Sequence, residues 1–561
     1  MKDEILKKLY QAVADANMQI SDTQKAKITL TNPDASMGDF ATNIALVLSK
    51  DAGRKPLDIA KDIVGKLDQK SFSSVKIAGP GFINLELKST ELLKELEKAA
   101  EQKRLHTEGK ILLEYFQPNI AKPLHIGHMQ NAIIGDSLKR IHLYMGKDVE
   151  SDTHLGDWGT QFGILILAYR MYGDPEVVAR DPITELNKLY VRLNQEIETN
   201  PDLKEQGKQE FVKLEQGDPE NRKLWKQFVD WSKEKFSKIH DLLDISKFEH
   251  DWPESFYEDK MPGVLDALKS KGILTESQGA QIVNLEDQNL GVAVIVKSDG
   301  GTTYLLRDLA TFIYVKKQGF RKHLYVVDNR QAHHYHQLFA ILKLMGEMED
   351  DEGLHIAYGF ISFKGEALSS RKGNMVLAED VLNEARKRVA KIIKEKNPAL
   401  ADKDKVIRTV SIGAIKYFIL SHNRNSDIEF NWDQALDFDG NSGPYLLYAH
   451  ARLSGILNKV NVQGSHTLED VVISGTEREL IIKCLGFNDV VAEVLRGYLP
   501  NLLANYLFEF SGLINKFYHE SPVMKESDEK LKFFRLKLIT RLRDTLAQGL
   551  NLLGIEALDE M

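Results

Sequence analysis

A strand, a loop and a long helix follow one another directly between residues 111 and 146, and this unit constrains the fold more than any other stretch. Residues 111–116 form an apolar run, and Pro118 and Asn119 then begin a polar loop. After the loop, apolar side chains recur at helical spacing up to Gly146, at Met129, Ile133, Ile134, Leu138, Ile141 and Met145. A buried strand that leads through a loop into a helix opens a nucleotide-binding α/β sheet. We therefore predict a Rossmann-like domain.

This domain is predicted to span residues 109–390, with an interruption. From about 172 to 290 the sequence is charged and strongly helical, with aromatic residues at short helical steps between Trp225 and Phe236. The sheet is expected to resume with residues 323–327 and 355–363, which read as strands. The pattern predicts a helical insertion within an α/β domain.

The two ends of the chain predict two further domains. Residues 1–108 begin with an amphipathic helix and continue into a pair of extended runs around Gly81, which is typical of a small α+β domain. Residues 400–561 are almost entirely helix-periodic and predict an all-α domain. The fold class that we predict is therefore multidomain α/β.

Charge and cysteine content limit the class of protein and its cellular compartment. The 561 residues include 74 Lys and Arg against 82 Asp and Glu, for a formal net charge of −8, which argues against a basic protein that coats nucleic acid. The single cysteine, Cys484, forms no internal disulfide and supplies no cysteine-rich zinc site. No signal-peptide core and no run of about 20 apolar residues is visible. We expect a cytoplasmic protein without a membrane partner.

Two histidines three residues apart lie where the loop turns into the helix. His125 and His128 would stand at the helix N-terminus, where unpaired N–H groups and the helix dipole attract anions. Gly127 between them leaves room for a flat base or ribose. Two imidazoles there would reach a phosphate chain together; the alternative is a pair of helix-start histidines without a ligand. A Walker-type phosphate loop is excluded, because the chain has no Gly-Lys-Ser or Gly-Lys-Thr.

The segment PNIAKPLHIGH, residues 118–128, resembles the HIGH signature of class I aminoacyl-tRNA synthetases in the form seen in arginyl-tRNA synthetases of the bacterial type. The resemblance implies a ligase that activates L-arginine with ATP to arginyl-adenylate and transfers arginine to the 3′-terminal adenosine of tRNA(Arg). It also implies ATP and Mg²⁺ as cofactors, and tRNA(Arg), arginine and ATP as partners. Activation is expected to depend on tRNA, and the protein is expected to be a monomer.

A second family element is expected after residues 355–363, where class I enzymes carry a loop that clamps the ATP phosphates. The sequence ALSSRKGN, residues 367–374, takes that place, with Ala367 and Ser370 at the two positions where lysine is usual. This departure resembles the degenerate loop of arginyl enzymes. In those enzymes a lysine before the HIGH motif substitutes for the missing loop lysine, and Lys122 occupies that position in this chain. A solvated turn is the alternative for this segment.

The resemblance assigns the catalytic roles and the ATP contacts. The catalytic residues are His125, His128, Lys122 and Gly127, and the ATP-binding residues are His125, Gly127, His128, Ser369, Ser370, Arg371 and Lys372. Attack of a carboxylate on the α-phosphorus of ATP needs little covalent help, because catalysis rests on positioned cations and N–H dipoles that stabilise the developing charge. The residue types in these two segments suit that chemistry.

Arginine recognition requires carboxylates, because burial of an unpaired guanidinium is prohibitively costly. The resemblance places Asn119 and Gln331 at the substrate α-amino group, and Tyr304, Asp308 and Glu254 at the guanidinium. Tyr304 and Asp308 are four residues apart and share one face if their stretch is a helix. The alternatives are a surface pair of Asp308 with Arg307, and a helix cap for Glu254.

Two other segments belong to the same resemblance. LGDWGTQFG, residues 155–163, is similar to a family loop whose glycines pass close to the adenosine site; a glycine-bent strand end is the alternative. His333, His334 and His336 cluster without a cysteine or an identifiable fourth ligand, so we predict no metal site there and expect a helix start whose His334 faces the nucleotide.

The ends of the chain resemble the tRNA-binding parts of arginyl enzymes. The N-terminal domain is implied to contact the D-loop at the tRNA elbow through Phe82 and Asn84, although Phe82 could equally belong to the core. The C-terminal domain is implied to bind the anticodon, with Tyr445, Tyr448 and Arg452 in NSGPYLLYAHAR. Basic residues on the last helix predict either phosphate contacts or a solvated face: Lys530, Lys532, Arg535, Lys537, Arg541 and Arg543.

Two other classes of function stay open at this point. One is a synthetase-like RNA-binding protein without catalysis, against which the intact Lys122, His125, His128 and Asp308 argue. The other is a tRNA-independent nucleotidyltransferase that joins a small acid, against which the large helical domain after the sheet argues. Exchange of pyrophosphate into ATP with arginine, with and without tRNA, separates all three.

Overall fold

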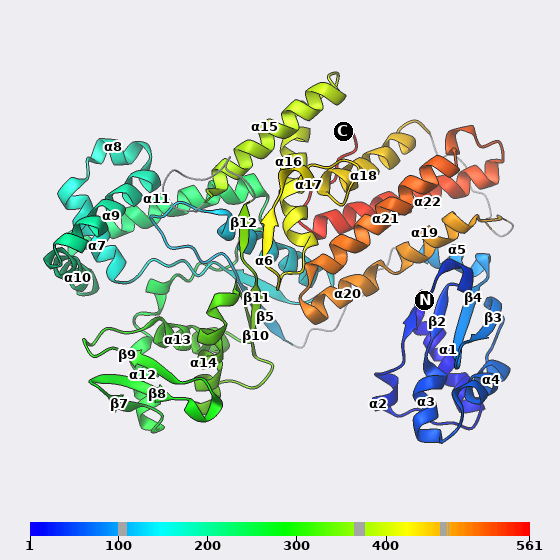
Figure 1. Cartoon of the computed structure of the whole chain (residues 1–561), viewed down its shortest axis with the longest axis horizontal. Coiled ribbons are helices and arrows are strands. Elements are labelled where there is room, and N and C mark those ends of the chain that lie inside the picture. The colour runs from blue at the N-terminus through cyan, green and yellow to red at the C-terminus, as the bar shows by residue number, and fades with distance from the viewer. Residues whose placement is uncertain (99–108, 364–375, 461–467, 469–470) are drawn as a thin grey trace.

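The structure, a computed structural model, describes residues 1–98, 109–363, 376–460, 468 and 471–561. Figure 1 shows a central α/β domain, a helical bundle on one side of it, and an N-terminal domain that hangs from the bundle. None of the helices in the described ranges is long and apolar enough to cross a membrane.

The N-terminal domain is a four-stranded antiparallel sheet packed against helices. Its strands β1 (Leu30–Thr31), β2 (Phe40–Thr42), β3 (Phe72–Ala78) and β4 (Phe82–Leu87) lie in the order β1-β2-β4-β3. Its helices are α1 (Lys2–Asp15), α2 (Asp22–Lys25), η1 (Ala35–Met37), α3 (Ile44–Ala52), α4 (Pro56–Lys66) and α5 (Ser89–Lys98). Gly81 links β3 to β4 at φ 135°, and a Cβ there would meet Pro56 at 2.9 Å, so the predicted turn requires glycine.

The central sheet is parallel, as the sequence predicts. β5 (Lys110–Glu114), β6 (Val149–Asp152), β10 (Phe320–Asp328) and β11 (Gly353–Tyr358) lie in the order β11-β10-β5-β6. The helices that follow or cover these strands are α6 (Ile126–Tyr144), α7 (Thr160–Tyr172), α13 (Tyr304–Lys317), η4 (Asn329–Gln331) and α14 (Ala332–Leu344). The carboxyl ends of the strands and the N-terminus of α6 therefore meet at one edge, which is where open α/β sheets bind ligands.

The stretch 355–363, expected as one strand, is two. β11 ends at Tyr358, and β12 (Ile361–Phe363) pairs instead with β13 (Ile428–Phe430) in a separate two-stranded sheet. Between them Gly359 crosses so close to residue Ser426 that a Cβ would lie 2.3 Å from its carbonyl oxygen. The apolar alternation continues across this crossing, so the pattern does not reveal the break.

The insertion is mainly helical as far as Ser270, the end of α12, and short strands follow. Its helices are α8 (Pro175–Arg180), α9 (Pro182–Thr199), α10 (Asp202–Glu215) and α11 (Pro219–Leu243). After them come η2 (Glu254–Tyr257), α12 (Met261–Ser270), η3 (Glu286–Gln288) and a small antiparallel sheet of β7 (Thr275–Ser277), β8 (Ala280–Asn284) and β9 (Val292–Val296). The helical prediction is wrong for residues 275–290, because these strands are short and largely exposed and so carry little hydrophobic periodicity.

The C-terminal domain is helical, as predicted, except for the short strand β13 that pairs with β12. Helices α15 (Ala378–Lys396) and α16 (Lys403–Ser421) lead from the sheet into the bundle of α17 (Trp432–Ala435), α18 (Gly443–Leu457), α19 (Gly475–Leu485), α20 (Phe487–Gly497), α21 (Pro500–Glu520), η6 (Val523–Lys525) and α22 (Glu529–Leu552). The buried Lys416 of α16 donates to the carbonyl oxygen of Gly554 at 2.6 Å, and Ser137 of α6 donates to that of Leu552 at 2.9 Å. The end of the chain is thus fastened to the helix that begins with the two histidines.

Candidate active site

One cavity of about 1000 Å³ lies at the carboxyl edge of the central sheet. It brings together side chains from segments that are far apart in the sequence, all predicted as site residues: Asn119, His125, Gly127, His128, Glu254, Tyr304, Asp308 and Gln331. His334 also lines the cavity, as expected, and Arg330 does so without having been predicted. Arg330 follows β10 directly beside Gln331, so its position after a parallel strand was a usable signal.

The two histidines cap the helix that they begin. The backbone N–H of Gly127 donates to Nδ1 of His125 at 3.1 Å, and the backbone N–H of His125 donates to Nδ1 of His128 at 3.2 Å. The rings stack with centroids 3.7 Å apart, and a Cβ at Gly127 would come within 3.1 Å of the His125 ring. Because each Nδ1 accepts a hydrogen bond, each neutral ring carries its proton on Nε2. The pair therefore offers two N–H donors side by side.

Both imidazoles are neutral at ordinary pH. Burial, followed by the charges of His125 and Lys122, lowers the pKa of His128 to about 3. Burial, with a smaller effect of Arg330, also lowers the pKa of His125. An anion at this helix N-terminus thus meets neutral N–H donors and the helix dipole.

Lys122 does not line the cavity but stands beside it. Its Nζ lies 5.3 Å from the ring centroid of Tyr190 in α9, and burial lowers its pKa. Its charge is close enough to His128 to contribute to the lowered pKa of that histidine. The helical insertion thus supplies an aromatic ring, that of Tyr190, for a cation–π contact with Lys122.

The carboxylates expected at a guanidinium are present, and one of them already has a partner. Glu254 Oε2 lies 3.4 Å from Nη1 of Arg307, whose Nη2 lies 3.2 Å from Oε1 of Glu258. Arg307 is only 5% exposed, so the alternative of a surface pair between Asp308 and Arg307 is wrong. Glu254 opens the short helix η2 without a side-chain cap, so the capping alternative is wrong too.

Asp308 faces the cavity from α13, together with Tyr304 at the start of that helix. His334 Nε2 lies 2.5 Å from Oδ2 of Asp308. Burial opposes protonation of His334, but this hydrogen bond and the charge of Asp308 raise its pKa overall. Tyr304 is 56% exposed at the cavity mouth. The expected helical face is confirmed.

The GDWG segment supports the loop before α6. Gly156 exchanges backbone hydrogen bonds with that loop, through Pro118 at 3.1 Å and Ile120 at 3.0 Å. A Cβ at Gly156 would lie 2.1 Å from Oδ1 of Asn119, so glycine is required where the two loops cross. Gln161 donates to the same Oδ1 at 3.5 Å. The segment therefore positions Asn119.

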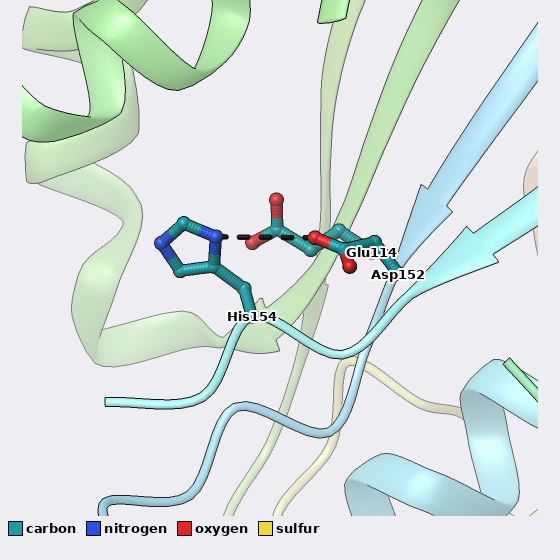
Figure 2. Close-up of side chains that lie close together, drawn as sticks. All are labelled: Glu114, Asp152 and His154. Carbon is teal, nitrogen blue, oxygen red and sulfur yellow. Dashed lines mark ion pairs between the residues drawn. The ribbon is translucent and has the colours of Figure 1, made fainter. Parts of the chain in front are cut away.

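A buried cluster that the sequence reading missed lies at the back of the cavity. Glu114, Asp152 and His154 each offer an atom that could bind a metal ion, and these atoms lie within 4.8 Å of one another. Figure 2 shows the three side chains turned toward one another from the ends of β5 and β6. Oδ2 of Asp152 and Nδ1 of His154 are buried without a hydrogen-bond partner, and Glu114 accepts from His323 at 2.9 Å. Burial and the charge of Glu114 raise the pKa of Asp152 well above its usual range. Glu114 and Asp152 are direct partners in the strand register, which a strand assignment could have revealed.

The side chains expected to contact tRNA differ in their exposure to solvent. Phe82 is 40% exposed at the start of β4, whereas Asn84, on the same face, is buried. Tyr448 is exposed on α18, and Arg452 lies over its ring at 4.4 Å and over that of Tyr518 at 5.1 Å. Arg452 also donates to Asn515, which with Tyr518 belongs to α21 and was not predicted. Tyr445 is half-buried against Phe508.

The basic residues of α22 do not form an open stripe. Arg535 is paired with Glu477 and Glu526 at 2.7 Å each. Lys537 is paired with Glu97, and Arg541 donates to the carbonyl oxygen of Leu96, both in α5. The expectation of a solvated face is wrong for Arg535, whose side chain is 12% exposed, and the phosphate contact stays a prediction. Lys537 and Arg541 hold α5 of the N-terminal domain to α22. Ser369, Ser370, Arg371 and Lys372 lie outside the described residues.

Three family models match the chain in sequence. Residues 3–87 match "Arginyl tRNA synthetase N terminal domain", residues 89–432 match "tRNA synthetases class I (R), catalytic domain", and residues 446–561 match "DALR anticodon binding domain". Together they cover nearly all of the chain.

Similar proteins and structures agree with these models. Proteins named arginine–tRNA ligase from Clostridium botulinum and Lactococcus lactis are each 38% identical, over 94% and 98% of this chain and 95% and 99% of their own length. The solved arginyl-tRNA synthetase of Thermus thermophilus superimposes with a TM-score of 0.84 at 25% identity, covering all of both chains. The Plasmodium falciparum arginyl-tRNA synthetase shares the fold, with a TM-score of 0.81.

Proposed function

This chain belongs to the arginyl-tRNA synthetases, and on that premise we propose how its residues divide the work of the reaction. The family joins arginine to tRNA at the expense of ATP. The arginine carboxylate attacks the α-phosphorus of ATP and pyrophosphate leaves. The arginyl-adenylate then transfers its acyl group to a ribose hydroxyl of the terminal adenosine of tRNA, and AMP leaves.

His125 and His128 take the ATP phosphates in this proposal. Their Nε2–H groups and the N-terminus of α6 face the cavity as preorganised dipoles, which stabilise the charge that develops on the α-phosphate and on the departing pyrophosphate. Lys122 supplies a fixed positive charge nearby, and Ser369, Ser370, Arg371 and Lys372 complete the phosphate contacts. Gly127 keeps the space beside the rings open.

In this proposal Mg²⁺ would enter bound to ATP. The cavity carboxylates Glu254, Asp308 and Glu114 are engaged by Arg307, His334 and His323. The phosphate oxygens would then hold the ion, which suits a cation that keeps much of its water shell. Its bound charge would balance that of the pyrophosphate.

Arginine lies with its side chain between Glu254 and Asp308. Tyr304 covers the guanidinium at the cavity mouth, and Asn119 and Gln331 hold the α-amino group. Two carboxylates on one planar cation satisfy its fork of donors and select arginine over lysine, whose ammonium fits neither geometry.

tRNA(Arg) binds along the two outer domains, at Phe82 and Asn84 on one and at Tyr445, Tyr448 and Arg452 on the other. Exposed aromatic side chains and an arginine are the groups that stack on unpaired bases. Activation requires tRNA, because a phosphate loop without its usual lysines depends on tRNA binding energy to order the site. The protein works as a cytoplasmic monomer.

The observation that carries the proposal is the convergence of the five predicted arginine residues with His125, Gly127 and His128 on one cavity. Pyrophosphate exchange into ATP tests it, with arginine, with and without tRNA, for the wild type and Asp308→Asn. We expect exchange only with tRNA, and at least a 10²-fold lower kcat/KM for arginine in the variant with an unchanged KM for ATP. A variant with wild-type arginine kinetics would refute the arginine site, and full exchange without tRNA would refute the coupling.

A further inference from the structure

The carboxylate expected to hold the substrate guanidinium is already held by a guanidinium of the chain itself. Arg307 lies behind the cavity wall on α13, with Nη1 3.4 Å from Glu254 Oε2 and Nη2 3.2 Å from Glu258 Oε1. Its side chain is 6% exposed, against 12% for Glu254. Glu254 lines the cavity, whereas Arg307 approaches it from the other side.

The two contacts fix the orientation of both partners. The planar guanidinium is anchored at each end by a different carboxylate, so its position is set by a fork rather than by one flexible contact. With Oε2 of Glu254 directed at Arg307, Oε1 is the oxygen left to accept a donor from the cavity. Glu254 is thus placed to bridge two guanidinium groups, one internal and one from the substrate.

The acidic groups around Glu254 explain why a permanent positive charge is needed beside it. Burial raises the pKa of Glu254 to about 8; the charge of Arg307 lowers it, those of Asp308 and Asp157 raise it, and the backbone N–H of Trp158 lowers it. Tyr304 faces Glu254 as well, and Glu258 and Glu215 add further acid around Arg307.

The other positively charged side chains near Glu254 contact different partners. His334 is bonded to Asp308, and Arg222 lies over the ring of Trp158. Lys233 is paired with Asp251. Among the residues that the structure describes, Arg307 is therefore the cation that contacts Glu254 directly.

We propose that Arg307 is a positioning residue for arginine selection: it holds Glu254 turned toward the cavity and offsets part of the cost of its charge, so that Glu254 can accept the substrate guanidinium. The inference rests on the proposed function, because it assumes that Glu254 meets the substrate. The arriving guanidinium completes the ionisation, and the proton of Glu254 leaves to solvent. Affinity for arginine should therefore rise with pH until Glu254 is ionised in the free protein.

The test compares Arg307→Met, Arg307→Lys and Glu258→Gln with the wild type, by arginine binding at equilibrium and by tRNA-dependent exchange between pH 6 and pH 9. The wild type should gain about tenfold in affinity from pH 7 to pH 9 and level off above about pH 8. Arg307→Met should bind arginine at least ~10-fold more weakly at pH 7.5, with little change in kcat, and should still be gaining affinity at pH 9. Arg307→Lys keeps the charge but loses the fork, so its loss should be intermediate, and Glu258→Gln should weaken binding in the same direction.

Arg170→Met is the matched control, because Arg170 pairs with Glu210 in the helical insertion, away from the cavity. It should leave arginine affinity and its pH profile unchanged. If Arg307→Met does not fold, Arg307→Lys and Glu258→Gln decide the question.

Wild-type affinity and a wild-type pH profile in the folded Arg307 variants would overturn the inference. Glu254→Gln separates this failure from a failure of the proposed function. If Glu254→Gln loses arginine binding while the Arg307 variants do not, Arg307 has no positioning role; if Glu254→Gln binds normally, the proposed arginine site itself is wrong.

Discussion

Replacement of Arg478 by methionine should release the N-terminal domain from the helical bundle. Arg478 of α19 donates through Nε to Asp39 Oδ1 at 2.7 Å, and through Nη2 to Asp39 Oδ2 and to the carbonyl oxygen of Leu87, both at 2.5 Å. The Asp39 side chain is 3% exposed and that of Arg478 19%. A cavity of about 790 Å³, lined by both domains, borders this pair.

The size of the effect follows from what the substitution leaves behind. Asp39 keeps the N–H of Leu87 at 2.7 Å but loses its bidentate cation, and removal of one partner of a buried pair costs about 3–5 kcal/mol. The lower end applies, because Arg478 is partly exposed and water can reach the vacated place. About 3 kcal/mol corresponds to a roughly 10²-fold larger population of the undocked domain.

Hydrogen exchange in α5 measures this population. α5 spans ten residues, is held against α22 by Lys537 and Arg541, and is too short to persist as an isolated helix. Its amides should exchange about 10²-fold faster in Arg478→Met, while those of β5 and β6 should not change. Arg54→Met is the control, since the Arg54–Asp62 pair lies within the domain with both side chains more than 40% exposed and contributes about 0–1 kcal/mol. Exchange within threefold of the wild type in α5 would refute the anchoring role.

Three further outcomes follow from the site and the core. His128→Ala should lower the rate of adenylate formation by ~10² or more in single-turnover kinetics, and His128→Gln should lose as much rate while its side chain keeps the helix cap, so that melting distinguishes the two variants. Lys122→Ala should reduce pyrophosphate exchange at least tenfold with an unchanged arginine affinity; a rate within twofold of the wild type would remove Lys122 from the proposal. Cys484, whose pKa burial raises to about 11, should react with iodoacetamide at pH 8 at least 100-fold more slowly than a free thiol, until the protein unfolds.

The elements that the sequence predicted well are those whose signal is local. The strand before Pro118, the helix from Ile126 and the glycine stop at Gly146 all follow from periodicity and turn chemistry within one short stretch. The same holds for the helix that carries Tyr304 and Asp308. The helical prediction for residues 275–290 was wrong for the opposite reason, because short exposed strands leave little periodic signal.

Contacts between distant residues were beyond the sequence. Glu254 and Arg307 are 53 positions apart, and nothing near either one records that they meet. Arg307 was instead expected beside its neighbour Asp308, since adjacency is all that a sequence shows. The α22 residues failed similarly: a run of basic side chains reads as a free surface, yet Arg535, Lys537 and Arg541 have partners from other segments.

The active-site cavity is electrically divided, and this division bears on how two oppositely charged substrates share it. At one end His125 and His128 are neutral, because burial lowers their pKa, so they offer N–H dipoles to the phosphates, and Lys122 adds a positive charge nearby. At the other end Glu254 and Asp308 carry or acquire negative charge, each restrained by an internal cation, Arg307 or His334. In the proposed site that acidic end would repel ATP and attract arginine, so each substrate would be steered to its own half before any contact is made. The reacting carboxylate and the α-phosphate, whose negatively charged oxygens repel it, would thus be brought together by binding energy from the far ends of both molecules.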